Sequence, residues 1–83
     1  MYRLIYDQRI EKDLRPIPKS QRGPLLERIA QLAETPRRPG VEKLAGIEGY
    51  RLRVGDYRAL FTIDDHQKLV MVYRIRHRRE AYR

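Results

Sequence analysis

Apolar residues recur at helical spacing through the first part of the chain. Residues 2–6 are aromatic and β-branched, and they predict a short first strand. Asp7 follows as a favourable helix N-cap, and apolar residues then return every three or four positions. Pro16 and Pro18 interrupt that spacing, because proline cannot continue a helix interior. The pattern therefore predicts a first helix over residues 8–15.

A second apolar stripe predicts a second helix. Its start is left open between Pro18 and Pro24, because a proline inside a helical pattern belongs to the first turn or marks a kink. Pro36 ends the helix, since the residue before a proline is pushed out of the helical region. Residues 37–49 are rich in glycine and proline, and we expect them to form a loop with one apolar anchor at Leu44.

The period of the apolar positions changes to two in the second half of the chain. Residues 50–54 and 57–63 alternate apolar and polar side chains, which predicts two strands. The Gly55-Asp56 pair between them indicates a two-residue hairpin turn with glycine at its first central position. Residues 64–67 predict a second turn. Residues 69–75 are apolar on both faces, as is typical of a strand in the middle of a sheet.

The elements follow the order β-α-α-β-β-β. We therefore expect one α+β domain over residues 1–83, in which a helical hairpin packs on one face of a small antiparallel sheet. The acidic residues on the helices are expected to lie on solvated faces. They are Glu11, Asp13, Glu27 and Glu34.

The two-residue turn also predicts the register of the hairpin. Arg53 is expected opposite Arg58, and directly opposite residues share one face of a sheet. Arg51 falls on that same face, while the alternate apolar residues face the helices. Like charges on neighbouring strands are destabilising, and a guanidinium group matches phosphate geometry, so we favour a phosphate-binding surface. The alternative is a solvated face whose aliphatic stems cover apolar neighbours.

Composition narrows the choice of partner. The chain has 19 Lys and Arg against 11 Asp and Glu, a net charge of +8, which indicates a polyanionic partner, either nucleic acid or an acidic protein. No apolar run reaches the roughly 20 residues that span a bilayer, and no N-terminal signal peptide is evident, so we expect a cytoplasmic protein without a membrane partner. The absence of cysteine excludes disulfides and cysteine-bound zinc.

The tail after the last predicted strand concentrates reactive groups. It brings an imidazole at His77, guanidinium groups at Arg78 and Arg79, and a phenol at Tyr82 within a few residues. The alternative is a frayed basic terminus. Residues 64–66 contain two carboxylates and an imidazole, but polar residues between two strands indicate a turn, and we expect no metal site there.

Three segments together resemble the RelE branch of the RelE/ParE toxin superfamily. They are Lys43-Leu44-Ala45-Gly46, residues 50–58 (YRLRVGDYR) and residues 75–82 (IRHRREAY). The resemblance covers nearly the whole chain. It implies the RelE-like fold and a toxin of a type II toxin–antitoxin pair, which enters the ribosomal A site and cleaves messenger RNA there. It also implies attack by the 2′-OH on the adjacent phosphate, without a metal or another cofactor.

The resemblance further implies the residues of the site. Arg51 and Arg53 would hold flanking phosphates, and Arg58 would stabilise the charge that builds on the phosphoryl oxygens. Arg78 would support the leaving oxygen, and Tyr82 would stack on a base or accept the 2′-OH proton. Further contacts with RNA are expected from Lys43, Arg76 and Arg79.

The general base is left open by the sequence. Some RelE toxins have lysines at the positions of Arg51 and Arg53, and a lysine can lose its proton whereas an arginine effectively cannot. His77 is the nearby group whose ordinary pKa suits proton transfer at neutral pH. Tyr82 has an ordinary pKa of about 10, which makes it a weak base there. The base is therefore Tyr82, His77 or neither.

Two other functions remain open on the same fold. One is a ParE-like inhibitor of DNA gyrase, and the other is a non-catalytic module that binds RNA or the ribosome. The expected partners are messenger RNA on the 70S ribosome and a cognate acidic antitoxin, whose binding segment wraps the toxin in a hetero-oligomer.

Overall fold

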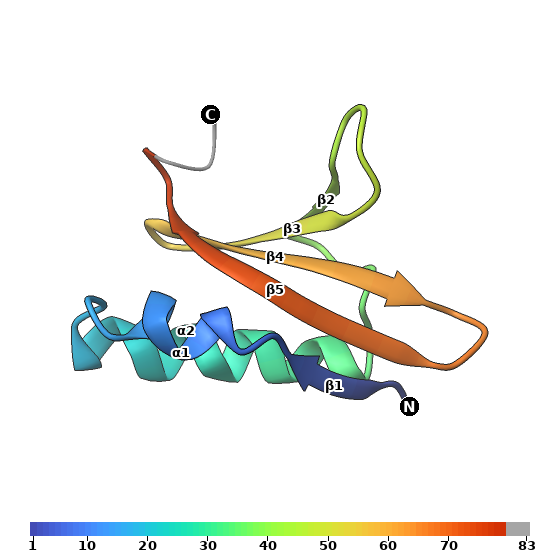
Figure 1. The fold of residues 1–83 in the computed structure, drawn as a ribbon, viewed down its shortest axis with the longest axis horizontal. Coiled ribbons are helices and arrows are strands. Elements are labelled where there is room, and N and C mark those ends of the chain that lie inside the picture. The colour runs from blue at the N-terminus through green and yellow to red at the C-terminus, as the bar shows by residue number, and fades with distance from the viewer. Residues whose placement is uncertain (80–83) are drawn as a thin grey trace.

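Residues 1–79 are described by a computed structural model. Both helices lie on the same side of a five-stranded sheet (Figure 1), and the predicted α+β class is confirmed. The predicted elements occur in the predicted order, with one additional strand between the second helix and the hairpin. No helix in this part of the chain has the length and apolar character needed to cross a bilayer. The elements are β1 (Arg3–Tyr6), α1 (Arg9–Leu14), α2 (Lys19–Ala30), the 3-10 turn η1 (Gln31–Ala33), β2 (Val41–Lys43), β3 (Tyr50–Val54), β4 (Tyr57–Asp64) and β5 (Leu69–His77).

The sheet differs from the predicted one in two respects. The strand order is β1-β5-β4-β3-β2, and β1 pairs parallel with β5, so the sheet is mixed rather than antiparallel throughout. Helices connect β1 to the other strands, so no hairpin turn sets its direction. The second difference is β2, which pairs antiparallel with β3 inside the predicted loop 37–49. Its three residues are too few to show a period of two.

The helix ends follow from local hydrogen bonds. The carboxylate of Asp7 accepts the backbone N–H of Arg9 at 2.9 Å, so Asp7 stabilises the start of α1 as expected. The start of α2, left open by the sequence, comes directly after Pro18, whose carbonyl accepts the N–H of Arg22 at 2.9 Å. Pro24 lies inside this helix.

One apolar core joins the helices to the sheet. Leu25 and Ile29 of α2 and Phe61 of β4 are fully buried, and they pack in the same cluster. The β3–β4 hairpin has the predicted register, with Arg53 opposite Arg58, so its alternate residues face the core. The remaining buried apolar residues are Ile10, Ile17, Leu32, Leu52, Ala59, Val70, Val72 and Ile75.

The turn between β4 and β5 carries a polar link to the N-terminal segment and to Arg37. Asp65 forms a two-point ion pair with Arg37, with nitrogen–oxygen distances of 2.7 and 3.0 Å, and it accepts a hydrogen bond from the hydroxyl of Tyr2. The hydrogen bonds from Arg37, followed by that from Tyr2, lower the pKa of Asp65 to about 2. Asp64 accepts the backbone N–H of Gln67 at 3.0 Å, which closes the turn.

We expect this ion pair to make stability depend on pH in the acid range. The pKa of Asp65 falls from 3.8 to about 2 on folding, so its contribution is complete above pH 3.8 and is lost as the pH falls toward 2. The effect is small because the side chain is 55% exposed. Urea unfolding of Asp65→Asn and wild type at several pH values should give stabilities that differ at neutral pH and converge near pH 2. A constant difference across that range would contradict the assignment.

Candidate functional site

Arginine side chains gather on the sheet face opposite the helices. Arg58 in β4 lies directly between Arg53 in β3 and Arg76 in β5, so three guanidinium groups cross three neighbouring strands. Arg51 precedes Arg53 by two residues and shares its face. We call these four residues the arginine face. Each like-charged pair directly opposite in a sheet is destabilising, by up to about 1 kcal/mol.

Arg58 is the buried member of this face. Its residue is only 5% exposed, and Nη1 donates to the carbonyl oxygens of Gly55 and Tyr57, both at 2.9 Å. Its Nε is buried and has no hydrogen-bond partner among the residues that the structure describes. Within residues 1–79 no carboxylate pairs with Arg58. Backbone contacts therefore hold this positive charge in a fixed position, without a counter-ion among residues 1–79.

The β2 strand adds a carboxylate that sequence analysis missed. Glu42 lies opposite Arg51, with Oε2 at 3.4 Å from Nη2 of Arg51, and its Oε1 is 3.9 Å from Nη2 of Arg53. The Arg53 side chain is 58% exposed, so this contact is weak and leaves Arg53 free to bind an external anion. Lys43, the next residue of β2, pairs with Tyr50 and therefore lies on the other face of the sheet.

The hairpin turn anchors the start of the tail. The backbone N–H of Arg78 donates to the carbonyl of Asp56 at 2.7 Å, and Nε of Arg78 lies 3.8 Å from Oδ1 of Asp56. This contact brings Arg78 to the same hairpin turn whose Gly55 carbonyl binds Arg58. Asp56 was predicted only as a turn residue. Arg79 is exposed, and Tyr82 lies outside the described residues.

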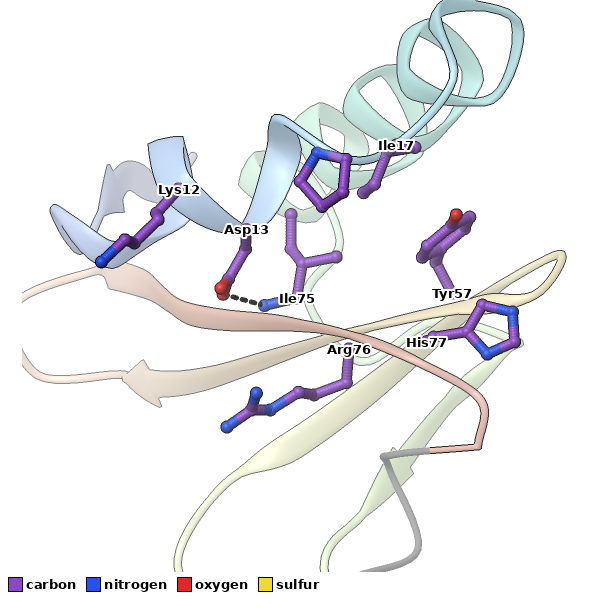
Figure 2. Close-up of a pocket in the computed structure, with 8 residues that line it drawn as sticks. Lys12, Asp13, Ile17, Tyr57, Ile75, Arg76 and His77 are labelled. Atoms are coloured by element: carbon purple, nitrogen blue, oxygen red, sulfur yellow. Dashed lines mark hydrogen bonds between the residues drawn. The ribbon is translucent and has the colours of Figure 1, made fainter.

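His77 does not lie on the arginine face. It pairs with Tyr57, whose ring it contacts edge-on with 5.4 Å between centroids. The two side chains line a cavity of about 380 Å³ on the side of the sheet that faces the helices. Figure 2 shows His77 beside Tyr57, while Arg76 points from the opposite side of β5. Successive residues of a strand point to opposite faces, so Arg76 joins Arg58 and His77 does not. His77 was a candidate base because it is close in sequence to the arginines of the tail, but sequence proximity does not show on which face of the sheet a side chain lies.

Solved structures of toxins share this fold. The chain is similar to the toxin–antitoxin complex RelBE2 from Mycobacterium tuberculosis, with 26% identity, a TM-score of 0.83, and coverage of 93% of this chain and 98% of the other. It is also similar to the archaeal RelE–RelB complex from Pyrococcus horikoshii (28%, TM-score 0.82, coverage 95% and 97%). It is similar as well to the isolated RelE toxin of E. coli, with 26% identity, a TM-score of 0.78, and coverage of 99% of this chain and 92% of the other. The fold is thus that of small toxins, some of which were solved together with an antitoxin.

A family model makes this assignment more specific. The model described as ParE toxin of type II toxin–antitoxin system, parDE, matches residues 4–82. The chain therefore belongs to the RelE/ParE family of type II toxin–antitoxin toxins. No curated protein sequence matches it significantly.

Proposed function

We propose that this toxin is a ribosome-dependent endoribonuclease that cleaves messenger RNA in the ribosomal A site. The observation that carries the proposal is Arg58, a buried guanidinium group that has no counter-ion within the described residues and lies between two further arginines. A charge fixed in this way costs stability in the free protein, and a bound phosphate would compensate for it. Cations held in place before the reaction also stabilise the charge that develops in a transition state.

The proposed reaction needs neither a metal nor another cofactor. The 2′-oxygen attacks the adjacent phosphorus, the P–O5′ bond breaks, and the products carry a 2′,3′-cyclic phosphate and a 5′-OH. Arg58 stabilises the phosphoryl oxygens, while Arg51 and Arg53 hold the flanking phosphates. Arg78, anchored at the hairpin turn, stabilises the leaving O5′, which takes up a proton from water to give the 5′-OH. Arg76 and Arg79 are proposed as further RNA contacts, whereas Lys43 lies on the other face of the sheet and is not proposed to bind the RNA at the arginine face.

The position of His77 directs the proposal for the general base to Tyr82. Arginines do not lose a proton at neutral pH, and His77 lies on the face opposite the arginine face. A tyrosine has an ordinary pKa of about 10, and nearby guanidinium groups favour its ionised form. We therefore propose that Tyr82, which lies outside the described residues, accepts the 2′-OH proton.

The proposed partner is a cognate antitoxin with an acidic binding segment. The similar toxins of M. tuberculosis and P. horikoshii were solved as toxin–antitoxin complexes. An acidic segment would neutralise the net charge of +8 and cover the arginine face in a hetero-oligomer. The proposed place of action is the cytoplasm, on 70S ribosomes.

The proposal is tested by translating a defined messenger in a purified bacterial system with antitoxin-free toxin. Primer extension should map breaks inside the A-site codon, and the downstream fragments should carry a 5′-OH. Arg58→Ala should slow cleavage by about 10²–10³-fold, because it removes the fixed positive charge. Arg15→Ala is the matched control, since Arg15 directly follows α1, away from the arginine face, and its side chain is 70% exposed. An intact messenger with folded wild-type protein would overturn the proposal.

Inhibition of DNA gyrase is the second candidate, because the matching family model is that of ParE toxins. The same protein preparation, added to gyrase and relaxed plasmid, separates the two functions. The nuclease proposal expects unchanged supercoiling, and a gyrase inhibitor blocks supercoiling while leaving the messenger intact.

A further inference from the structure

The turn between β3 and β4 has a specific backbone geometry. Gly55 has a φ of 58°, and Lys68 is the only non-glycine residue among residues 1–79 with a positive φ, so φ of Asp56 is negative. A two-residue turn with positive φ at the first central residue alone is of type II′. The other favoured hairpin turn, type I′, has positive φ at both. The two types differ by a flip of the central peptide through roughly half a turn.

That central peptide carries the carbonyl that binds Arg58. Its oxygen belongs to Gly55 and accepts Nη1 of Arg58 at 2.9 Å. The next carbonyl, that of Asp56, accepts the N–H of Arg78 at 2.7 Å. Consecutive carbonyls of one turn thus contact two arginines that lie on different strands or segments of the site.

We propose that the Gly55-Asp56 turn is a positioning element of the site, in which the central peptide carbonyl orients the Arg58 guanidinium and Asp56 holds Arg78. The catalytic part of this inference rests on the proposed nuclease function; the orientation of Arg58 does not. Type II′ geometry directs the Gly55 oxygen toward Arg58, whereas a type I′ peptide directs it away. The sequence indicated a turn with glycine at its first central position and the hairpin register, but not that the turn carbonyls contact Arg58 and Arg78.

A change of turn type distinguishes a turn that positions Arg58 from one that only reverses the direction of the chain. The double variant Gly55→Asn/Asp56→Gly introduces an Asn-Gly pair, which favours type I′ in a two-residue hairpin. It keeps the loop length and therefore the pairing of Arg53 with Arg58. A turn with a purely structural role would tolerate this swap. A positioning turn would release Arg58 while the fold stays intact.

The first measurement is hydrogen exchange of the arginine Nε–H groups by ¹⁵N NMR. The buried Nε of wild-type Arg58 should exchange much more slowly than that of the exposed Arg53. In the turn-swapped variant the Arg58 signal should exchange at least ten times faster. The matched control Asp56→Asn keeps the turn type and both carbonyls, so its Arg58 signal should stay slow. Equal exchange of Arg58 and Arg53 in the wild type overturns the inference even if the double variant does not fold.

The second measurement is single-turnover cleavage on programmed ribosomes. Displacing a catalytic group by about 1 Å can cost roughly 10²-fold in rate, so the turn-swapped variant should lose about 10- to 100-fold in kcat with little change in KM. Asp56→Asn should lose only a few-fold, through weaker restraint of Arg78. Unchanged kcat and unchanged exchange in a folded double variant contradict the inference. Absent cleavage by the wild type contradicts the nuclease proposal alone, because the exchange measurement still decides whether the turn orients Arg58.

Discussion

Replacement of Arg58 with methionine should make the protein more stable while it strongly slows cleavage. Arg58 faces a like charge on each neighbouring strand, and its buried Nε lacks a partner within the described part of the chain. An unbranched apolar side chain of similar length removes both penalties, at the loss of two hydrogen bonds to carbonyls. We expect a gain of about 1 kcal/mol in the free energy of unfolding. The melting temperature should rise by about 5 °C, and cleavage should slow by about 10²–10³-fold.

Thermal and urea unfolding of the antitoxin-free protein measure the first effect, and the messenger cleavage rate measures the second. Arg53→Met is the matched control, because Arg53 lies on the same face but its side chain is 58% exposed. Its stability should change by no more than about 0.5 kcal/mol. A destabilised Arg58→Met protein would mean that the hydrogen bonds of Arg58 to the hairpin turn outweigh the charge repulsion. In that case Arg58 would be a structural residue.

The sequence predicted the register of the β3–β4 hairpin correctly, because only one pairing of these strands is compatible with the core. The alternation around Gly55-Asp56 has a single pairing that buries Leu52 and Ala59 together, and a register shifted by one residue would bury arginines instead. The register then places Arg53 and Arg58 on one face without further information. Neighbouring arginines on one face repel one another and do not stabilise the sheet, so the sequence indicated this face as a candidate site.

Other parts of the site depend on contacts that no local pattern encodes. Arg76 reaches the arginine face through the pairing of β4 with β5, which contains a register irregularity between Leu60 and Phe61. Counting along the chain does not carry across such an irregularity. The carboxylate of Glu42 reaches the same face from a strand of three residues. Asp13 was expected on a solvated helix face, and instead its side chain is only 11% exposed.

Asp13→Ala should be the most destabilising of these substitutions. β1 pairs with β5 only as far as Val72, so β5 continues beyond the end of its neighbour. There Oδ2 of Asp13 accepts the backbone N–H of Ile75 at 2.9 Å, as the dashed line in Figure 2 shows. The same carboxylate binds Nε and Nη2 of Arg74 at 2.9 and 3.1 Å. Removing it leaves a strand amide and a guanidinium group, 25% exposed, without their partner.

We expect Asp13→Ala to lower the free energy of unfolding by about 3 kcal/mol, because unpaired buried groups are more costly than their bonds are favourable. The melting temperature should fall by about 15 °C, as measured by thermal unfolding. Glu11→Ala on the same helix is the control, since its side chain is 81% exposed and its ion pair with Arg15 should contribute less than about 0.5 kcal/mol. Asp13→Asn keeps an acceptor for the Ile75 amide but loses the charge opposite Arg74, so it should fall between the two. If Asp13→Ala matches Glu11→Ala, water replaces the carboxylate at the end of β5, and the link between α1 and β5 depends on apolar packing alone.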